Sequence, residues 1–75
     1  MDLEYLDWYD VYSSNVARIA YDGDNMALFV EFNNGYIYEY DEVPPDVWDQ
    51  FIAAPSKGKF VHTNLKNIYP YFRLN

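Results

Sequence analysis

The chain has 75 residues, which is enough for one hydrophobic core and excludes a second independent domain within this length. Aromatic residues make up 21% of it, with nine tyrosines and five phenylalanines, and such large side chains partly offset the small size of the core. The sequence contains no cysteine. Disulfide scaffolds and thiolate metal sites are therefore excluded, and a reducing compartment is favoured.

The net charge of −7 argues against a protein held to nucleic acid by its overall field. The charge is divided along the chain, however. All twelve acidic residues lie in 1–49, where Arg18 is the only base, whereas 50–75 contains Lys57, Lys59, Lys66 and Arg73 and no acid. This division predicts surfaces of opposite charge if the fold separates the two parts.

Residues 1–12 (MDLEYLDWYDVY) form an acidic extension without a clean helical or strand period. We expect this extension to dock through Leu6, Trp8 or Tyr9, and a folded domain to occupy residues 13–75. A secretory signal would need positive charge and an unbroken apolar stretch, and no run reaches membrane-spanning length. We therefore expect a cytoplasmic protein with no membrane association.

The strongest local signal is a β-hairpin over residues 26–41 (MALFVEFNNGYIYEYD), preceded by a strand over 16–21 and a turn over 22–25. A three-residue loop, Asn33-Asn34-Gly35, pairs Phe32 with Tyr36, Val30 with Tyr38 and Leu28 with Tyr40. This register gives a nearly apolar face, whereas a two-residue loop at Asn34-Gly35 gives two mixed faces. We therefore predict the three-residue loop.

Two short helices are predicted after the hairpin. Pro44 and Pro45 open a helix over residues 46–54, and Pro55 ends it. A second helix is expected over 56–67, followed by an extended edge segment over 69–74 that contains Pro70. The predicted fold class is α+β, with an antiparallel sheet of three or four strands packed against two short helices.

With these elements placed, an ordered set of residues between positions 11 and 74 forms a recognisable pattern. It comprises Ser13-Ser14, Tyr21-Asp22, Phe32, Gly35, Tyr38-Glu39-Tyr40, Val43-Pro44, Ala54, Ser56, Gly58 and Phe60. In this set the sequence resembles the KTSC domain, a family found at the C-terminus of some lysyl-tRNA synthetases and as free-standing bacterial and phage proteins. Through its synthetase context, the resemblance suggests RNA binding.

The basic C-terminal part is the first candidate site, for RNA or single-stranded nucleic acid. Ser56 can cap the second helix, Gly58 permits close approach of a ligand, and the cations suit phosphate groups. The alternative is a solvated loop whose lysines maintain solubility. The candidate residues are Ser56, Lys57, Gly58, Lys59, His62, Lys66 and Arg73.

The tyrosine row Tyr36, Tyr38 and Tyr40 has two interpretations. Sheet aromatics stack on bases in several RNA-binding modules. The predicted register, however, places these three residues with Leu28 and Val30. We therefore assign the row to the core.

The acidic extension supports a different hypothesis, a protein-interaction domain of phage or mobile-element type. Carboxylates interspersed with aromatic residues can dock on the basic groove of a nucleic-acid-handling protein. The candidate residues are Asp2, Glu4, Asp7, Trp8 and Asp10. Here too, the alternative role of these acids is solubility.

Catalysis, a cofactor and a metal site are not expected. His62 is the only histidine, and no nucleophile-elbow sequence surrounds Ser13, Ser14 or Ser56. The Asp22–Asn25 segment has the start of a calcium loop, but Asn33 stands where the closing glutamate would fall. The sequence therefore predicts a binding module rather than an enzyme.

Overall fold

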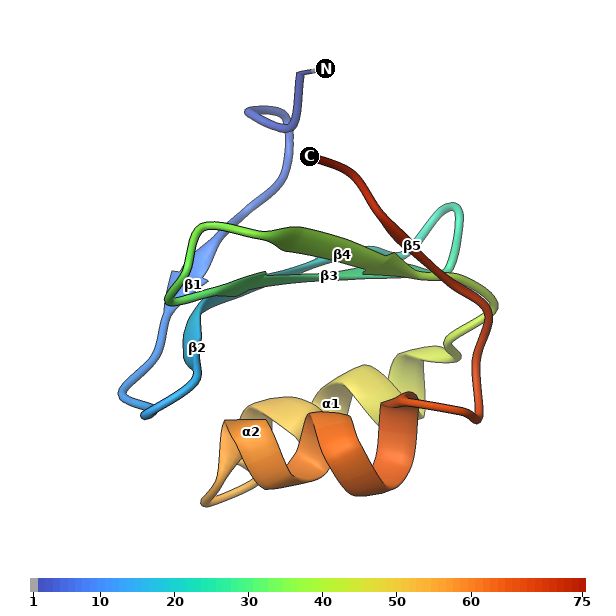
Figure 1. The fold of residues 1–75 in the computed structure, drawn as a ribbon. Coiled ribbons are helices and arrows are strands. Elements are labelled where there is room, and N and C mark those ends of the chain that lie inside the picture. The colour runs from blue at the N-terminus through green and yellow to red at the C-terminus, as the bar shows by residue number, and fades with distance from the viewer. Residues whose placement is uncertain (1) are drawn as a thin grey trace.

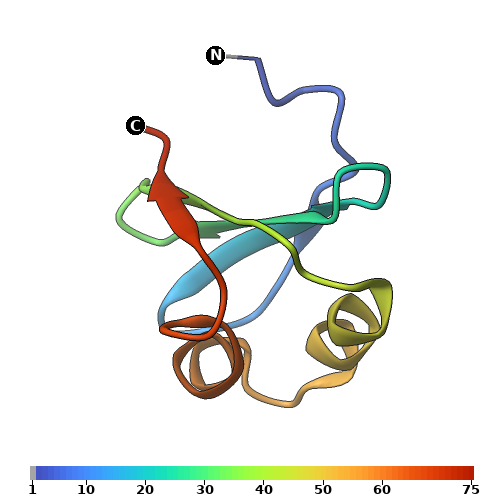
Figure 2. The same cartoon turned by 90° about the vertical axis from the view of Figure 1, so that its right-hand side faces the viewer.

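A computed structural model describes residues 2–75, and Met1 lies outside the described residues. It has an antiparallel sheet of five strands in the order β1-β2-β3-β4-β5, with both helices on one face (Figure 1). The two helices lie side by side beneath that face (Figure 2). The predicted α+β class is confirmed. The sheet is wider than the predicted three or four strands because residues 9–10 of the predicted extension pair with residues 18–19 as a further edge strand.

The elements follow one another in the predicted order. The strands are β1 (Tyr9–Asp10), β2 (Val16–Asp22), β3 (Ala27–Phe32), β4 (Ile37–Tyr40) and β5 (Tyr71–Arg73), and the helices are α1 (Pro45–Ala53), α2 (Lys57–Phe60) and the π-helical segment η1 (Val61–Leu65). Between β2 and β3 the Asp22 carboxylate accepts the backbone N–H groups of Asp24 and Asn25, which closes the predicted turn. The extended segment near the C-terminus takes the edge position expected of it.

The β3–β4 hairpin has the predicted register. Val30 lies opposite Tyr38 and Leu28 opposite Tyr40. At the loop the Phe32 N–H donates to the Tyr36 carbonyl over 2.9 Å, and Gly35 has a φ of +93°. The three-residue loop is therefore confirmed, with its glycine in a conformation that side-chain-bearing residues rarely adopt.

The core fills the space between the inner face of the sheet and the helices. A shift of register between Val16 and Arg18 lets Val16 and Ile19 both face inward, although they are three residues apart. The buried core residues are Val16, Ile19, Leu28, Val30, Tyr40, Val43, Phe51, Phe60, Val61 and Leu65. Phe51 of α1 and Phe60 of α2 stack with ring centroids 5.0 Å apart and so join the two helices.

The N-terminal segment covers part of the outer face of the sheet (Figure 1). Leu6 is buried with Ala20, Ala27 and Phe29, and Trp8 meets Phe29 edge-on. The Arg18 guanidinium lies 4.2 Å from the centre of the Trp8 ring and pairs with Glu31 over 2.7 Å. Leu6 and Trp8 thus dock the extension on the outer face, whereas the third candidate, Tyr9, is half-exposed and places its ring 6.0 Å from that of Trp48 in α1.

Gly35→Ala is expected to lower the free energy of unfolding by about 1–2 kcal/mol, because an alanine at this positive φ is strained. An added Cβ would meet no atom within 4 Å, so the loss is purely conformational. Gly23→Ala is the matched control: its φ is outside the left-handed region and its Cβ would make an ordinary 3.6 Å contact with Tyr21. Urea unfolding of both variants checks this, and equal losses would contradict the account.

Candidate functional site

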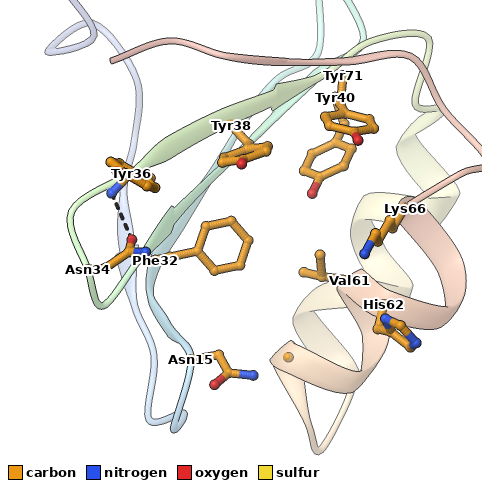
Figure 3. A pocket seen from close by; sticks show the side chains of 11 residues that line it. Asn15, Phe32, Asn34, Tyr36, Tyr38, Tyr40, Val61, His62, Lys66 and Tyr71 are labelled. Atoms are coloured by element: carbon orange, nitrogen blue, oxygen red, sulfur yellow. Dashed lines mark hydrogen bonds between the residues drawn. The ribbon is translucent and has the colours of Figure 1, made fainter.

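A cleft of about 400 Å³ lies between the inner face of the sheet and the α2–η1 segment (Figure 3). Its size falls within the range of sites that hold small organic ligands. On the sheet side, the buried Leu28 and Val30 of β3 give way to the partly exposed Tyr36 and Tyr71. The lining residues are Asn15, Phe32, Asn34, Tyr36, Tyr38, Tyr40, Gly58, Val61, His62, Lys66 and Tyr71.

The sheet side of the cleft is a cluster of aromatic rings, called here the tyrosine cluster and comprising Tyr36, Tyr38, Tyr40 and Tyr71. Tyr38 stacks on Tyr40 and Tyr71 with centroids 6.5 and 5.8 Å apart. Tyr40 is 3% exposed, but Tyr36 and Tyr71 are 42% and 44% exposed. The assignment of the whole row to the core is therefore wrong. The row begins in the core at Tyr40 and leaves it toward the hairpin loop, where no helix covers the strand.

Burial raises the pKa of Tyr40 to about 12, with smaller effects from the neighbouring Tyr38 and Tyr71 phenols. Tyr40 is consequently a neutral hydroxyl throughout the physiological pH range. Such a group forms hydrogen bonds but is a poor proton carrier near pH 7.

The helix side of the cleft is formed by α2 and η1. The Lys66 N–H donates to the Val61 carbonyl over 2.8 Å, which is the five-residue spacing of a π-helical turn. Val61, His62 and Lys66 line the cleft from this segment, and the Lys66 side chain reaches toward the tyrosine cluster (Figure 3). Local π-helical turns often occur at functional sites.

The cleft carries positive charge. Opposite Tyr38 in β5, Arg73 faces the same side of the sheet, and its guanidinium lies 4.5 Å from the centre of the Tyr36 ring. Lys66 supplies a second cation from the helix side. No Asp or Glu belongs to the lining within residues 2–75. An anionic ligand therefore meets two cations without a carboxylate beside them.

The C-terminal residue holds the sheet side of this cleft in place. The Asn75 side chain accepts the Ile37 N–H and donates to the Gly35 carbonyl, both over 2.9 Å. This contact ties the end of the chain to the hairpin loop, 38 and 40 residues away in sequence. It also keeps β5, and with it Arg73, against β4.

The structure divides the predicted basic residues. Gly58, His62 and Lys66 line the cleft, and Arg73 lies beside it. The Lys57 ammonium instead donates to the carbonyls of Ile52 and Ala54 at the end of α1. Lys57 is therefore a helix cap.

The remaining two residues of the predicted set lie elsewhere. Ser56 caps α2 by accepting the Lys59 N–H over 3.2 Å. Lys59 is exposed and lines a different depression, together with Phe60 and Asn64.

Sequence reasoning missed the exposed half of the tyrosine cluster and the two asparagines of the cleft. The alternation of Tyr36 and Tyr38 is visible in the sequence, but nothing in it indicates how far the helices extend beneath them. Asn15 and Asn34 have the sequence context of loop residues. Only the folded chain brings both to the cleft, with Asn15 next to Gly58 of α2.

The outer face carries the acidic candidates. Asp2, Glu4, Asp7 and Asp10 are exposed, while Trp8 is half-buried against the sheet. On this face a hydrogen bond shared with Asp41, partial burial, and the charges of Asp41 and Asp22 raise the pKa of Glu39 to about 7. The face opposite the cleft is thus crowded with carboxylates. The charge division seen in the sequence is only partly a division between the two sides of the sheet, because Asp46 and Asp49 belong to α1 on the inner side and Arg18 lies on the outer side.

Within residues 2–75 no group of three or more His, Cys, Asp or Glu side chains is arranged to hold a metal ion. No helix in this part of the chain is long and apolar enough to cross a bilayer.

Comparison with known proteins identifies the family. A sequence model described as "KTSC domain" matches residues 12–69. A crystal structure of a KTSC domain protein from Yersinia pestis superposes with a TM-score of 0.86 at 31% identity, covering 93% of this chain and 99% of that one. The chain belongs to the KTSC domain family, and the resemblance seen in the sequence is confirmed.

Relatives of two lengths are found among individual proteins. A small protein from Tsukamurella paurometabola is 41% identical over 63 residues, covering 84% of this chain and 90% of that protein. A protein named lysine–tRNA ligase from Trichormus variabilis is 34% identical over 62 residues. That match covers 83% of this chain but 11% of the ligase, so the chain corresponds to a small part of the longer protein.

Glu39→Gln is expected to flatten the pH dependence of stability between about pH 5 and 7.5. Because the folded pKa is raised, the folded state holds a proton that the unfolded state has released, so this stabilising contribution is full at low pH and lost as pH rises through about 7. Urea unfolding at several pH values should show the variant more stable than the wild type above pH 7. Parallel curves for the two proteins would contradict the assignment.

Proposed function

We propose that this protein is a non-catalytic, cytoplasmic module that binds single-stranded RNA in the cleft between the tyrosine cluster and η1. The observation that carries the proposal is a cleft that combines exposed aromatic rings with Lys66, has Arg73 beside it, and has no acid in its described lining. Non-specific single-strand binding proteins combine the same two features, a stacking platform and a positive groove.

Tyr36 and Tyr71 supply the stacking platform. Each ring is more than two-fifths exposed on the cleft side, so a base can cover it without displacing core side chains. Stacking of a base on an aromatic ring contributes about 1–3 kcal/mol. Arg73 strengthens the platform because its guanidinium already lies over Tyr36 and can contact the phosphate that joins two stacked bases.

The net charge of −7 does not oppose this function at close range. The acids of the outer face are separated from the cleft by the sheet, and exposed charges are screened over about 8 Å at physiological ionic strength. The cleft cations act within contact distance of the ligand. The acidic residues outside the cleft repel nucleic acid from the rest of the surface. Strands are therefore expected to bind only where they enter the cleft.

The relatives support RNA as the ligand class. The proteins named lysine–tRNA ligase carry a region similar to this chain, and an enzyme of that name acts with tRNA. Non-catalytic action is supported by the cleft itself, where the buried Tyr40 hydroxyl is held neutral. Cytoplasmic location is supported by the absence of cysteine from the sequence.

A second candidate function concerns the opposite face. The exposed carboxylates of Asp2, Glu4, Asp7 and Asp10 lie on the side of the sheet that carries Glu39, and together they offer a surface for a basic protein. Trp8 offers such a partner little binding surface, because its ring packs on Phe29 and Arg18. We rank this candidate below RNA binding.

Lys66→Glu is expected to weaken binding of a single-stranded RNA oligonucleotide at least tenfold at about 50 mM salt. The slope of the logarithm of the binding constant against the logarithm of the salt concentration should also become shallower by about one, because one phosphate contact is lost. The matched control is Lys59→Glu, which makes the same change of charge seven residues earlier, outside the cleft. Fluorescence anisotropy with a labelled oligonucleotide checks both variants.

Three results decide the proposal. Loss of binding in Lys66→Glu with affinity kept in Lys59→Glu supports the cleft. Equal losses would show that binding depends on overall charge and not on this site. No binding by the wild type at about 50 mM salt, where phosphate contacts are strongest, would overturn RNA binding altogether.

A further inference from the structure

The cleft continues beyond the tyrosine cluster. A second depression of about 400 Å³ lies beside the hairpin loop and is lined by Ser14, Asn15, Phe32, Asn33 and Asn34. Asn15, Phe32 and Asn34 also line the cleft itself. The two hollows therefore adjoin each other, and together they are called here the groove. One half of this groove is aromatic and the other half is rich in side-chain amides.

The backbone of the amide half is fixed. The Asn33 N–H donates to the Asn15 carbonyl over 2.8 Å, and the Asn15 N–H donates to the Ser13 hydroxyl over 3.1 Å. The Asn33 side chain donates to the Ser13 carbonyl over 3.2 Å. The β1–β2 connection and the hairpin loop are therefore joined to each other, and side chains in this half are presented from a defined backbone.

Hydrogen-bonding groups remain available on this rigid base. The side-chain oxygen Oδ1 of Asn34 accepts the Tyr36 N–H over 3.0 Å (Figure 3). This bond orients the Asn34 side chain and leaves its NH₂ group free to donate to another acceptor. The Asn15 amide is exposed and makes no side-chain hydrogen bond to residues 2–75. Asn15 thus offers an adjacent donor and acceptor at the junction of the two hollows.

We propose that Asn15, assisted by Asn34, reads the edge of one base of the strand whose neighbour stacks on the tyrosine cluster, and that this base is adenine. The inference rests on the proposed function of the cleft. A side-chain amide pairs with a base edge that presents a donor next to an acceptor, and adenine N6 and N7 form the pair that asparagine most often contacts. Unpaired bases expose these edges, whereas a duplex hides them from such a groove.

Gly58 sets the distance between this amide and the helix. A Cβ built on Gly58 would lie 3.1 Å from Asn15 Nδ2, closer than an ordinary contact. Gly58→Ala therefore displaces the Asn15 amide while favouring the helix through its higher propensity. The variant separates base reading from folding, because a loss of reading is expected without a loss of stability.

The test measures the affinity of the wild type and its variants for A₆, U₆ and C₆ RNA oligonucleotides by fluorescence anisotropy. The wild type is expected to bind A₆ about tenfold more tightly than U₆ or C₆. Asn15→Ala and Gly58→Ala should reduce this ratio to about two or less, because they weaken the affinity for A₆ more than the affinity for U₆. The matched control, Asn64→Ala, removes an exposed amide outside the groove and should keep the ratio.

Stacking alone also favours adenine. The variants are therefore needed to show whether the preference comes from stacking or from the Asn15 amide. A preference for A₆ that survives Asn15→Ala overturns the inference, because it then comes from the tyrosine cluster. Equal binding of the three oligonucleotides by the wild type also overturns it and leaves RNA binding intact. Failure of the wild type to bind any of them overturns both proposals. A preference for another base overturns the assignment of adenine.

Discussion

The pairing of β3 with β4 determines what each side of this molecule can do. With Gly35 at a φ of +93° closing a three-residue loop, Leu28, Val30 and the tyrosines face the helices, and Phe29 and Glu39 face outward. A slip of one residue would exchange the two faces. The register therefore places aromatic rings on the side where Lys66 and Arg73 lie, and carboxylates on the side covered by the N-terminal segment.

The cleft exists because the core is asymmetric. Phe51, Phe60 and Leu65 are buried in the core, while the edge strand β5 widens the sheet beyond β4. Tyr71 is therefore half-exposed although it touches the buried Tyr40. The same side chains stabilise the domain at one end of the row and offer a binding surface at the other. A change at Tyr40 would affect folding, whereas a change at Tyr36 would affect the surface.

Local patterns predicted most of the fold: the hairpin register, the turn at Asp22, both helices and the edge position of the last strand. They failed where distant segments meet. Nothing near Lys57 in sequence shows that its ammonium caps α1, and nothing near Asn75 shows that its amide holds the hairpin loop. The candidate site was predicted in part for the same reason. Lys66 and His62 were found by charge and type, but Asn15 joins them only through tertiary contact.

The surface proposed to meet RNA is the inner cleft and not the acidic outer face. Chemical-shift mapping on the isotopically labelled protein tests this most directly, because every backbone amide reports separately. Adding single-stranded RNA should shift the amides of Tyr36, Tyr38, Tyr71 and Val61–Leu65, and leave those of Leu6, Ala20 and Phe29 in place. Shifts confined to the outer face, or none at all, would contradict the account.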